Sequence, residues 1–130
     1  GILLLDLDSF KRINNAAGAE VGDQALIEVG MMLQEVLRTD GVVARYGSDK
    51  FAILLPPDST IKINVRIRDV AERARAAIGT KSFAGIQLSA CFGGISLPQN
   101  EITSAPDAVA MADDLLSEAR SRGRGEVRIK

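Results

Sequence analysis

Two apolar runs on either side of a short turn constrain the fold of this chain more than any other feature. The runs read GVVARY at residues 41–46 and KFAILL at residues 50–55, with Gly-Ser-Asp at residues 47–49 between them. Apolar stretches of this length around a tight, glycine-containing turn predict an antiparallel hairpin. Two prolines at residues 56–57 end the second strand, because proline cannot extend the hydrogen-bond ladder. The hairpin excludes a sheet made only of parallel strands.

Helices and further strands are predicted around this hairpin. A buried strand is expected over residues 2–8, and apolar residues at helical spacing predict a helix over residues 21–37. The other expected elements are a helix from Ser9 as N-cap to Gly18 as stop, a helix capped by Asp58, Ser59 or Thr60 and reaching about Ile78, a strand over 86–97, a helix over 104–123 and a strand over 126–130. This order predicts an α/β (α+β) fold with a mixed five-stranded central sheet flanked by helices, formed by residues 1–130 as a single domain.

Composition excludes several classes of site and partner. The chain has no histidine, which removes Ser-His-Asp chemistry and most zinc sites, and Cys91 alone cannot form an intrachain disulfide. A net charge of -1 gives no reason to expect nucleic acid or a lipid surface as partner. No apolar run approaches the ~20 residues of a membrane span, so we expect a cytoplasmic domain without membrane insertion.

Acidic residues end the first predicted strand. Asp6 and Asp8 are two residues apart, so both carboxylates point to one face of the strand, about 7 Å apart. They can hold a hard cation such as Mg²⁺, which prefers carboxylate oxygens and substrate phosphates. They can equally be acids placed favourably before a helix N-terminus. Asp49, at the hairpin tip, is expected to approach them if the hairpin lies beside the first strand.

Basic and amide side chains have two interpretations as well. Lys11, Arg120 and Arg124 can hold phosphates, or the two arginines can simply favour the C-terminal end of the last helix. Asn14 and Asp23 can hydrogen-bond the edge of a base, or cap a helix. Spacing alone leaves these alternatives open.

Four ordered segments together resemble the GGDEF domain, the catalytic domain of diguanylate cyclases. They are DLDSFKRINNAAGAEVGDQAL at 6–26, VARYGSDKFAILLP at 43–56, LSACFGGIS at 88–96 and ADDLLSEARSRGRGEV at 112–127. The resemblance covers almost the whole chain and implies a fold similar to nucleotidyl cyclase and polymerase palm domains. It also implies that the chain is a piece of a longer signalling protein, because the N-terminal helix that usually precedes the first strand in this family is absent.

The family joins two GTP molecules into cyclic di-GMP where two domains meet face to face, so the resemblance implies a guanine nucleotide, cyclic di-GMP or GTP, as ligand. The residues that it implies are the magnesium positions Asp6, Asp8 and Asp49, the guanine-reading positions Asn14 and Asp23, the phosphate positions Lys11, Arg120 and Arg124, and the first signature glycine, Gly47. The family's R-x-x-D product-inhibition site is half present, since Arg38 matches its arginine and Gly41 stands at its aspartate.

The signature itself departs from the family at two positions. Ser48 stands where the signature has its second glycine. Serine fits poorly where the backbone adopts positive φ or approaches a ligand closely. Lys50 stands where the family signature has glutamate, so the charge beside a dication site is reversed. One pair of unit charges ~4 Å apart interacts by roughly 4 kcal/mol at an effective dielectric near 20. Lysine also cannot accept a proton as a carboxylate does. The Lys50 ammonium can instead stand where a metal would, paired with Asp6 or Asp49, so that nucleotide binding needs no magnesium.

These departures predict a catalytically inactive GGDEF domain that binds cyclic di-GMP or GTP as a regulatory module for attached signalling domains. The alternatives are a weakly active diguanylate cyclase and a structural module that forms a homodimer. A receiver domain also has acids after its first strand, but the hairpin at residues 41–55 contradicts its parallel βα repeat.

Overall fold

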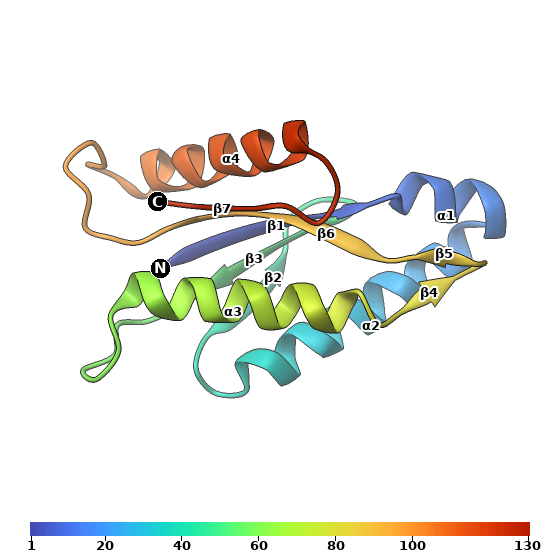
Figure 1. Ribbon diagram of the computed structural model, residues 1–130, viewed down its shortest axis with the longest axis horizontal. Helices are drawn as coiled ribbons and strands as arrows, with labels where there is room; N and C mark the ends of the chain where they lie inside the picture. The colour runs from blue at the N-terminus through green and yellow to red at the C-terminus, as the bar shows by residue number, and fades with distance from the viewer.

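A five-stranded sheet runs through the middle of the molecule (Figure 1). In this computed structural model, which describes residues 1–130, the strand order is β2-β3-β1-β6-β7. The strands are β1 (Ile2–Asp8), β2 (Val42–Arg45), β3 (Lys50–Leu54), β6 (Ser89–Ile95) and β7 (Val127–Ile129). β6 and β7 are parallel and the other neighbours are antiparallel, so the predicted mixed sheet and its hairpin are confirmed.

Helices cover both faces of this sheet (Figure 1). They are α1 (Phe10–Ala17), α2 (Ala19–Leu37), α3 (Ile63–Ile78) and α4 (Ala105–Arg122). Leu3 and Leu5 of β1 belong to the larger core, on the side of α2 and α3, whereas Leu4 belongs to a smaller core under α4. Because side chains alternate along a strand, Asp6 lies on the α4 side. None of the helices combines the length and the apolar character needed to cross a bilayer.

Two predicted helix caps differ from the structure. The Asp58 carboxylate accepts hydrogen bonds from the backbone N–H groups of Thr60 (2.7 Å) and Ile61 (3.2 Å), so it closes a local turn and does not cap α3. α3 begins later than predicted, after Lys62, without a side-chain cap. Ser9 does stand at the start of α1, but it has φ 64° and makes no capping hydrogen bond. Short polar residues favour turns as readily as caps, which is why sequence could not separate the two.

The strand predicted over residues 86–97 is two strands. β5 (Ile86–Gln87) pairs with β4 (Ser82–Phe83) in a separate hairpin, and β6 follows after Leu88. This hairpin lies at the same end of the molecule as α1 (Figure 1). Its strands have two residues each, too short for an alternating pattern to predict.

The close packing of α4 against β6 depends on a glycine. A Cβ on Gly93 would lie 2.2 Å from the Leu116 nitrogen and 2.5 Å from the Ala112 oxygen, both backbone atoms of α4. β6 continues through Gly93 and Gly94 in register with β1, so the double glycine marks a close backbone approach and not a bulge. This contact fixes the distance of α4, and of its last turn, from the sheet.

Candidate functional site

The adjacent ends of β1 and β3 bring two carboxylates together. Asp6 is opposite Lys50 in the antiparallel register, and the Leu7 N–H donates to the Asp49 carbonyl over 3.0 Å. Asp6 is only 3% exposed. Burial, reinforced by the charge of Asp49 beside it, raises the pKa of Asp6 to about 6. The prediction that Asp49 approaches the acids of the first strand is therefore confirmed for Asp6.

An arginine from α4 partly neutralises this acid pair. Arg120 Nη1 lies 2.9 Å from Asp6 Oδ2 and opposes the rise in the Asp6 pKa. Lys50 forms no ion pair with Asp6 or Asp49, contrary to the hypothesis that its ammonium pairs with one of them. The Lys50 side chain instead lies along the turn, with three of its carbons 3.2–3.4 Å from where a Gly47 Cβ would be. Its charge still acts at a distance to lower the pKa of Asp6.

The hairpin turn is held by Arg45. The Arg45 side chain donates to the Gly47 carbonyl over 3.0 Å and to the Ser48 carbonyl over 3.2 Å, and the Ser48 hydroxyl lies 3.4 Å from Asp49 Oδ1. Ser48 is not among the residues with positive φ, so backbone conformation gives no reason for a poor fit of serine here. The close approach to a ligand stays a prediction. An ordinary residue fits the backbone of this turn, and the serine adds a donor beside the Asp49 carboxylate.

Asp8 has other partners than the acid pair. It accepts hydrogen bonds from the Ser89 hydroxyl (2.7 Å) and the Gly125 N–H (2.9 Å), and Cys91 Sγ lies 3.5 Å from it. It therefore braces the turn after α4. No group of three or more Asp, Glu, His or Cys side chains is placed to hold a metal ion. Asp8 therefore does not join Asp6 and Asp49 in one group of carboxylates, and the binding of magnesium by these residues stays a prediction.

The predicted base-reading residues lie on the α1–α2 pair. A Cβ on Gly22 would lie 1.7 Å from Asn14 Oδ1, so the first turn of α2 packs directly against the Asn14 amide. Gly22 therefore lies at a close contact between α1 and α2. Asp23 follows it on α2, and Lys11 lies on α1; both are exposed.

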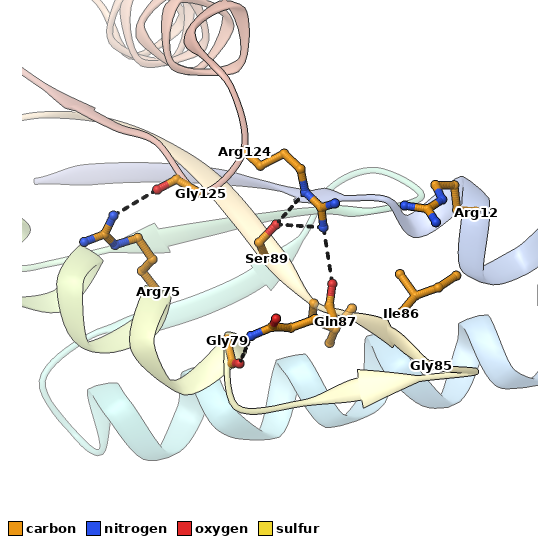
Figure 2. Close-up of a pocket in the computed structure, with 10 residues that line it drawn as sticks. Arg12, Arg75, Gly79, Gly85, Ile86, Gln87, Ser89, Arg124 and Gly125 are labelled. Carbon is orange, nitrogen blue, oxygen red and sulfur yellow. Dashed lines mark hydrogen bonds between the residues drawn. The ribbon is translucent and has the colours of Figure 1, made fainter.

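The two predicted phosphate-binding arginines diverge. Arg120 contacts the acid pair, but Arg124 donates to the Ser89 hydroxyl over 3.4 Å and to the Gln87 carbonyl over 3.3 Å (Figure 2). The guanidinium of Arg124 therefore lies against β5 and β6. The structure places only the first of the two at the acids.

The predicted inhibitory site has only its arginine. Arg38 ends α2 with φ 53° and is exposed. At the family's aspartate position, a Cβ on Gly41 would lie 2.6 Å from the Leu54 oxygen, so this backbone has no room for a side chain there. The neighbouring Asp40 offers its carbonyl to Arg66 over 3.1 Å. The structure adds a steric reason for glycine at residue 41, and product binding at Arg38 stays a prediction.

Sequence reasoning missed one residue beside the acids. Tyr46, the last residue of the first apolar run, is 44% exposed. Burial of its hydroxyl end, together with the charges of Asp113, Asp6 and Asp49, raises the pKa of Tyr46 to about 12. Its place next to a turn could have indicated a partly exposed position, because the ring of tyrosine is apolar and its hydroxyl is polar.

Comparison with known proteins identifies the family. The family described as "Diguanylate cyclase, GGDEF domain" matches residues 1–126. The chain belongs to the GGDEF domain family. Diguanylate cyclase A from Treponema denticola is 33% identical to it over 129 residues, which are 97% of this chain and 34% of that protein. Cyclic di-GMP phosphodiesterase PdeR from Escherichia coli K12 is 30% identical over 127 residues, 97% of this chain and 19% of that protein. The chain thus spans about a third or less of these two relatives.

A solved structure shows the same fold. The active GGEEF domain of a diguanylate cyclase from Vibrio cholerae superimposes with a TM-score of 0.86 at 24% identity, covering 98% of this chain and 80% of that one. The palm-like GGDEF fold expected from the resemblance is therefore confirmed.

Proposed function

We propose that this GGDEF domain acts in cyclic di-GMP signalling by binding a guanine nucleotide, cyclic di-GMP or GTP, without synthesising cyclic di-GMP. One observation carries the proposal. The buried Asp6 is already paired with Arg120, and Lys50 stands beside it where the family signature has glutamate. The site has gained cationic character while it has kept its carboxylates, which favours holding a phosphate-bearing ligand over turning it over.

Binding is supported by what remains around the acids. Asp6 lies near the end of β1 and Asp49 lies in the hairpin turn. Arg120 contacts Asp6, and its side chain is exposed enough to contact a ligand phosphate as well. Asn14 is held against α2 beside Asp23. These residues come from five segments of the chain, namely β1, the hairpin turn, α4, α1 and α2.

The two carboxylates fit a magnesium ion that is shared with ligand phosphates. Mg²⁺ is usually held by one or two carboxylates plus phosphate oxygens. Burial raises the pKa of Asp6 first, and the neighbouring Asp49 charge, which adds to that rise, supplies the second carboxylate. Asp6 and Asp49 would hold the ion, which would screen the charge of the phosphates. Arg120 would then exchange its contact with Asp6 for one with a phosphate. Asp8 is not required, because it braces the turn after α4.

Loss of catalysis is attributed to Lys50. An ammonium can neither take a proton from an attacking hydroxyl nor add a ligand to magnesium. A relative named for degrading cyclic di-GMP matches 97% of this chain, which supports a role for such domains outside synthesis. Attached domains would read the nucleotide-bound state, and a homodimer would be the natural form if the two-domain arrangement of the family is retained.

A weak diguanylate cyclase is the second candidate, because the Asp6–Asp49 pair is present. Titration calorimetry with GTP and with cyclic di-GMP, each in Mg²⁺ and in EDTA, tests binding, and product analysis after incubation with GTP and Mg²⁺ or Mn²⁺ tests synthesis. We expect binding at micromolar concentration and no product.

Variants of two aspartates test the acid pair. Asp49→Asn should weaken the Mg²⁺-dependent binding, whereas Asp114→Asn, which alters an exposed aspartate on α4, should not. Product that disappears in Asp49→Asn would favour the cyclase, and no binding of either nucleotide would leave a structural dimerisation module.

A further inference from the structure

A stripe of exposed residues, the α2 stripe, runs along the outer side of α2. Its members recur alternately every four and every three residues, which is the spacing of a helix that pairs with another helix. They are Glu20, Gln24, Ile27, Met31, Gln34 and Arg38, the last of which directly follows the helix. The buried residues of α2, such as Leu26, Val29 and Leu33, point into the core instead, so the stripe is the solvent side of this helix.

The centre of the α2 stripe is apolar. Ile27 is 56% exposed and Met31, one turn later, is 61% exposed. Met31 also lines a groove of about 700 Å³ between α2 and α3, whose other apolar lining residues are Met32, Val36 and Ala77. The two helices lie side by side on one face of the sheet (Figure 1). Methionine side chains adapt to irregular surfaces, so this centre suits an apolar side chain from another helix.

The order of residues in the α2 stripe is complementary to itself in the reverse direction. When two copies of α2 run antiparallel with their midpoints together, apolar residues meet in the centre, amides meet further out, and an acid meets a base at each end. The facing pairs are Ile27 with Met31, Gln24 with Gln34, and Glu20 with Arg38. Each pair occurs twice, because a twofold axis relates the copies. A parallel pair would instead place each charge opposite its own copy, so the charges favour the antiparallel direction.

The charged ends of the α2 stripe have no partners within the molecule. Neither Glu20 nor Arg38 belongs to an ion pair, so both are available to a second copy. Next to the apolar centre, Gly30 adds no side chain between the helices. On the side of α3, Glu28 flanks the centre and lines a smaller pocket together with Lys81, which offsets its charge. The surroundings of the stripe therefore permit a close approach of a second helix.

We propose that the α2 stripe binds a second copy of this chain, and that two copies pair through antiparallel α2 helices. This pairing puts the α1–α2 junctions, which carry Asn14 and Asp23, at opposite ends of the helix pair, so it differs from the face-to-face arrangement of the family. The stripe is about 27 Å long at 1.5 Å per residue, which makes a small interface. The dimer is therefore weak, with a dissociation constant on the order of tens of micromolar. The inference does not depend on nucleotide binding at the acid pair.

Charge reversal at the two ends of the α2 stripe tests the pairing. Sedimentation equilibrium of the 130-residue chain, in EDTA and without nucleotide, measures the dissociation constant. Glu20→Arg and Arg38→Glu should each weaken the dimer about tenfold, because two attractive pairs become repulsive. The double variant should return to within about threefold of the wild type, since the pairs then attract again. Within one copy these two residues are about 27 Å apart, so only contact between copies can produce this rescue.

A matched pair of lysine variants tests the apolar centre. Ile27→Lys should weaken the dimer more than tenfold, because each copy would bury an ammonium against Met31 of the other. Val65→Lys alters an apolar residue of α3 that is 53% exposed and lies outside the α2 stripe, and it should leave the dissociation constant unchanged. Circular dichroism checks that every variant is folded.

Three results would overturn the proposal. A wild-type chain that stays monomeric at several hundred micromolar would leave the α2 stripe to a different protein. Equal losses in Ile27→Lys and Val65→Lys would indicate a general effect of added charge. A double charge-reversal variant no tighter than the two single variants would place the interface elsewhere or in another direction.

Discussion

Arg120 Nη1 lies 2.9 Å from Asp6 Oδ2, so the last turn of α4 is joined to the buried end of β1 by an ion pair of unequal exposure. The Asp6 side chain is 5% exposed and the Arg120 side chain is 57% exposed. The carboxylate has thus lost most of its water, while the arginine that compensates it can still reach a ligand. This asymmetry underlies the first two predictions.

Arg120→Ala should destabilise the fold by about 1–2 kcal/mol at pH 7.5. Removing the partner of a buried charge costs more than losing a surface pair, but more than half of the Arg120 side chain is in water, which reduces the effect. Urea denaturation measures the change. Arg122→Ala, in the same last turn of α4 and also exposed, serves as the control and should leave stability within about 0.5 kcal/mol of the wild type. Equal effects of the two variants would mean that the ion pair contributes nothing specific.

Asp6 should make the protein less stable as the pH rises from about 4 to about 6. Its pKa is near 3.8 in the unfolded chain and about 6 in the folded protein, so between these values the folded state binds more protons. Stability therefore falls with rising pH in this window. Asp58 and Asp107 have lowered pKa values and act in the opposite direction, at more acidic pH. Urea titrations at pH 4, 5, 6 and 7 should show a flatter dependence in Asp6→Asn; an unchanged slope would contradict this role of Asp6.

Gly93→Ala should destabilise the domain by about 3 kcal/mol or more, since the new methyl group would meet two backbone atoms of α4 that cannot move separately. Moving α4 would also separate Arg120 from Asp6. Gly30→Ala is a matched control within α2, because its methyl group would meet only Phe51 at 3.7 Å and alanine favours a helix. Thermal denaturation should show a large loss for the first variant and no loss for the second. A Gly93→Ala protein as stable as the wild type would show that α4 can lift away without cost.

Lys50→Glu should make the site responsive to magnesium. The lysine charge lowers the pKa of Asp6, and replacing it with a carboxylate adds a third acid near Asp6 and Asp49. We expect the variant to be less stable than the wild type in EDTA and to gain more stability from millimolar Mg²⁺. Differential scanning fluorimetry in the presence and absence of Mg²⁺ measures both. Lys50→Gln controls for loss of the lysine alone, and an equal magnesium response in all three proteins would count against a metal site at the acid pair.

Much of this fold could be predicted because its elements carry strong local patterns. The buried strand at Ile2–Asp8 and the apolar runs around the hairpin were found within a residue or two, and their pairing followed from the short turn. The β4–β5 hairpin was missed, because two-residue strands have no periodicity to detect. The late start of α3 was missed because Asp58 uses its carboxylate on nearby residues that follow it.

Around the acids, the proximity of Asp6 and Asp49 was predicted, but most side-chain contacts were not. Asp6 and Asp49 were expected together because a strand end and a hairpin tip were expected side by side. Lys50 was expected as an ion-pair partner of Asp6, whereas the structure pairs Asp6 with Arg120. This arginine comes from a helix at the far end of the sequence, and its position is set by α4 packing on Gly93. Magnesium at Asp6 stays a prediction. The diversion of Asp8 to Ser89 and Gly125 likewise depends on tertiary structure that no local pattern reports.

The tight contact at Gly41 has a consequence for how this sequence can change. Because a Cβ there would lie 2.6 Å from the Leu54 oxygen, an aspartate could return to this position only if the start of β2 first moved away from the end of β3. Gly41→Asp would therefore complete the R-x-x-D sequence next to Arg38 without giving the new side chain room. The approach of the β2 start to the end of β3 thus keeps this position to glycine.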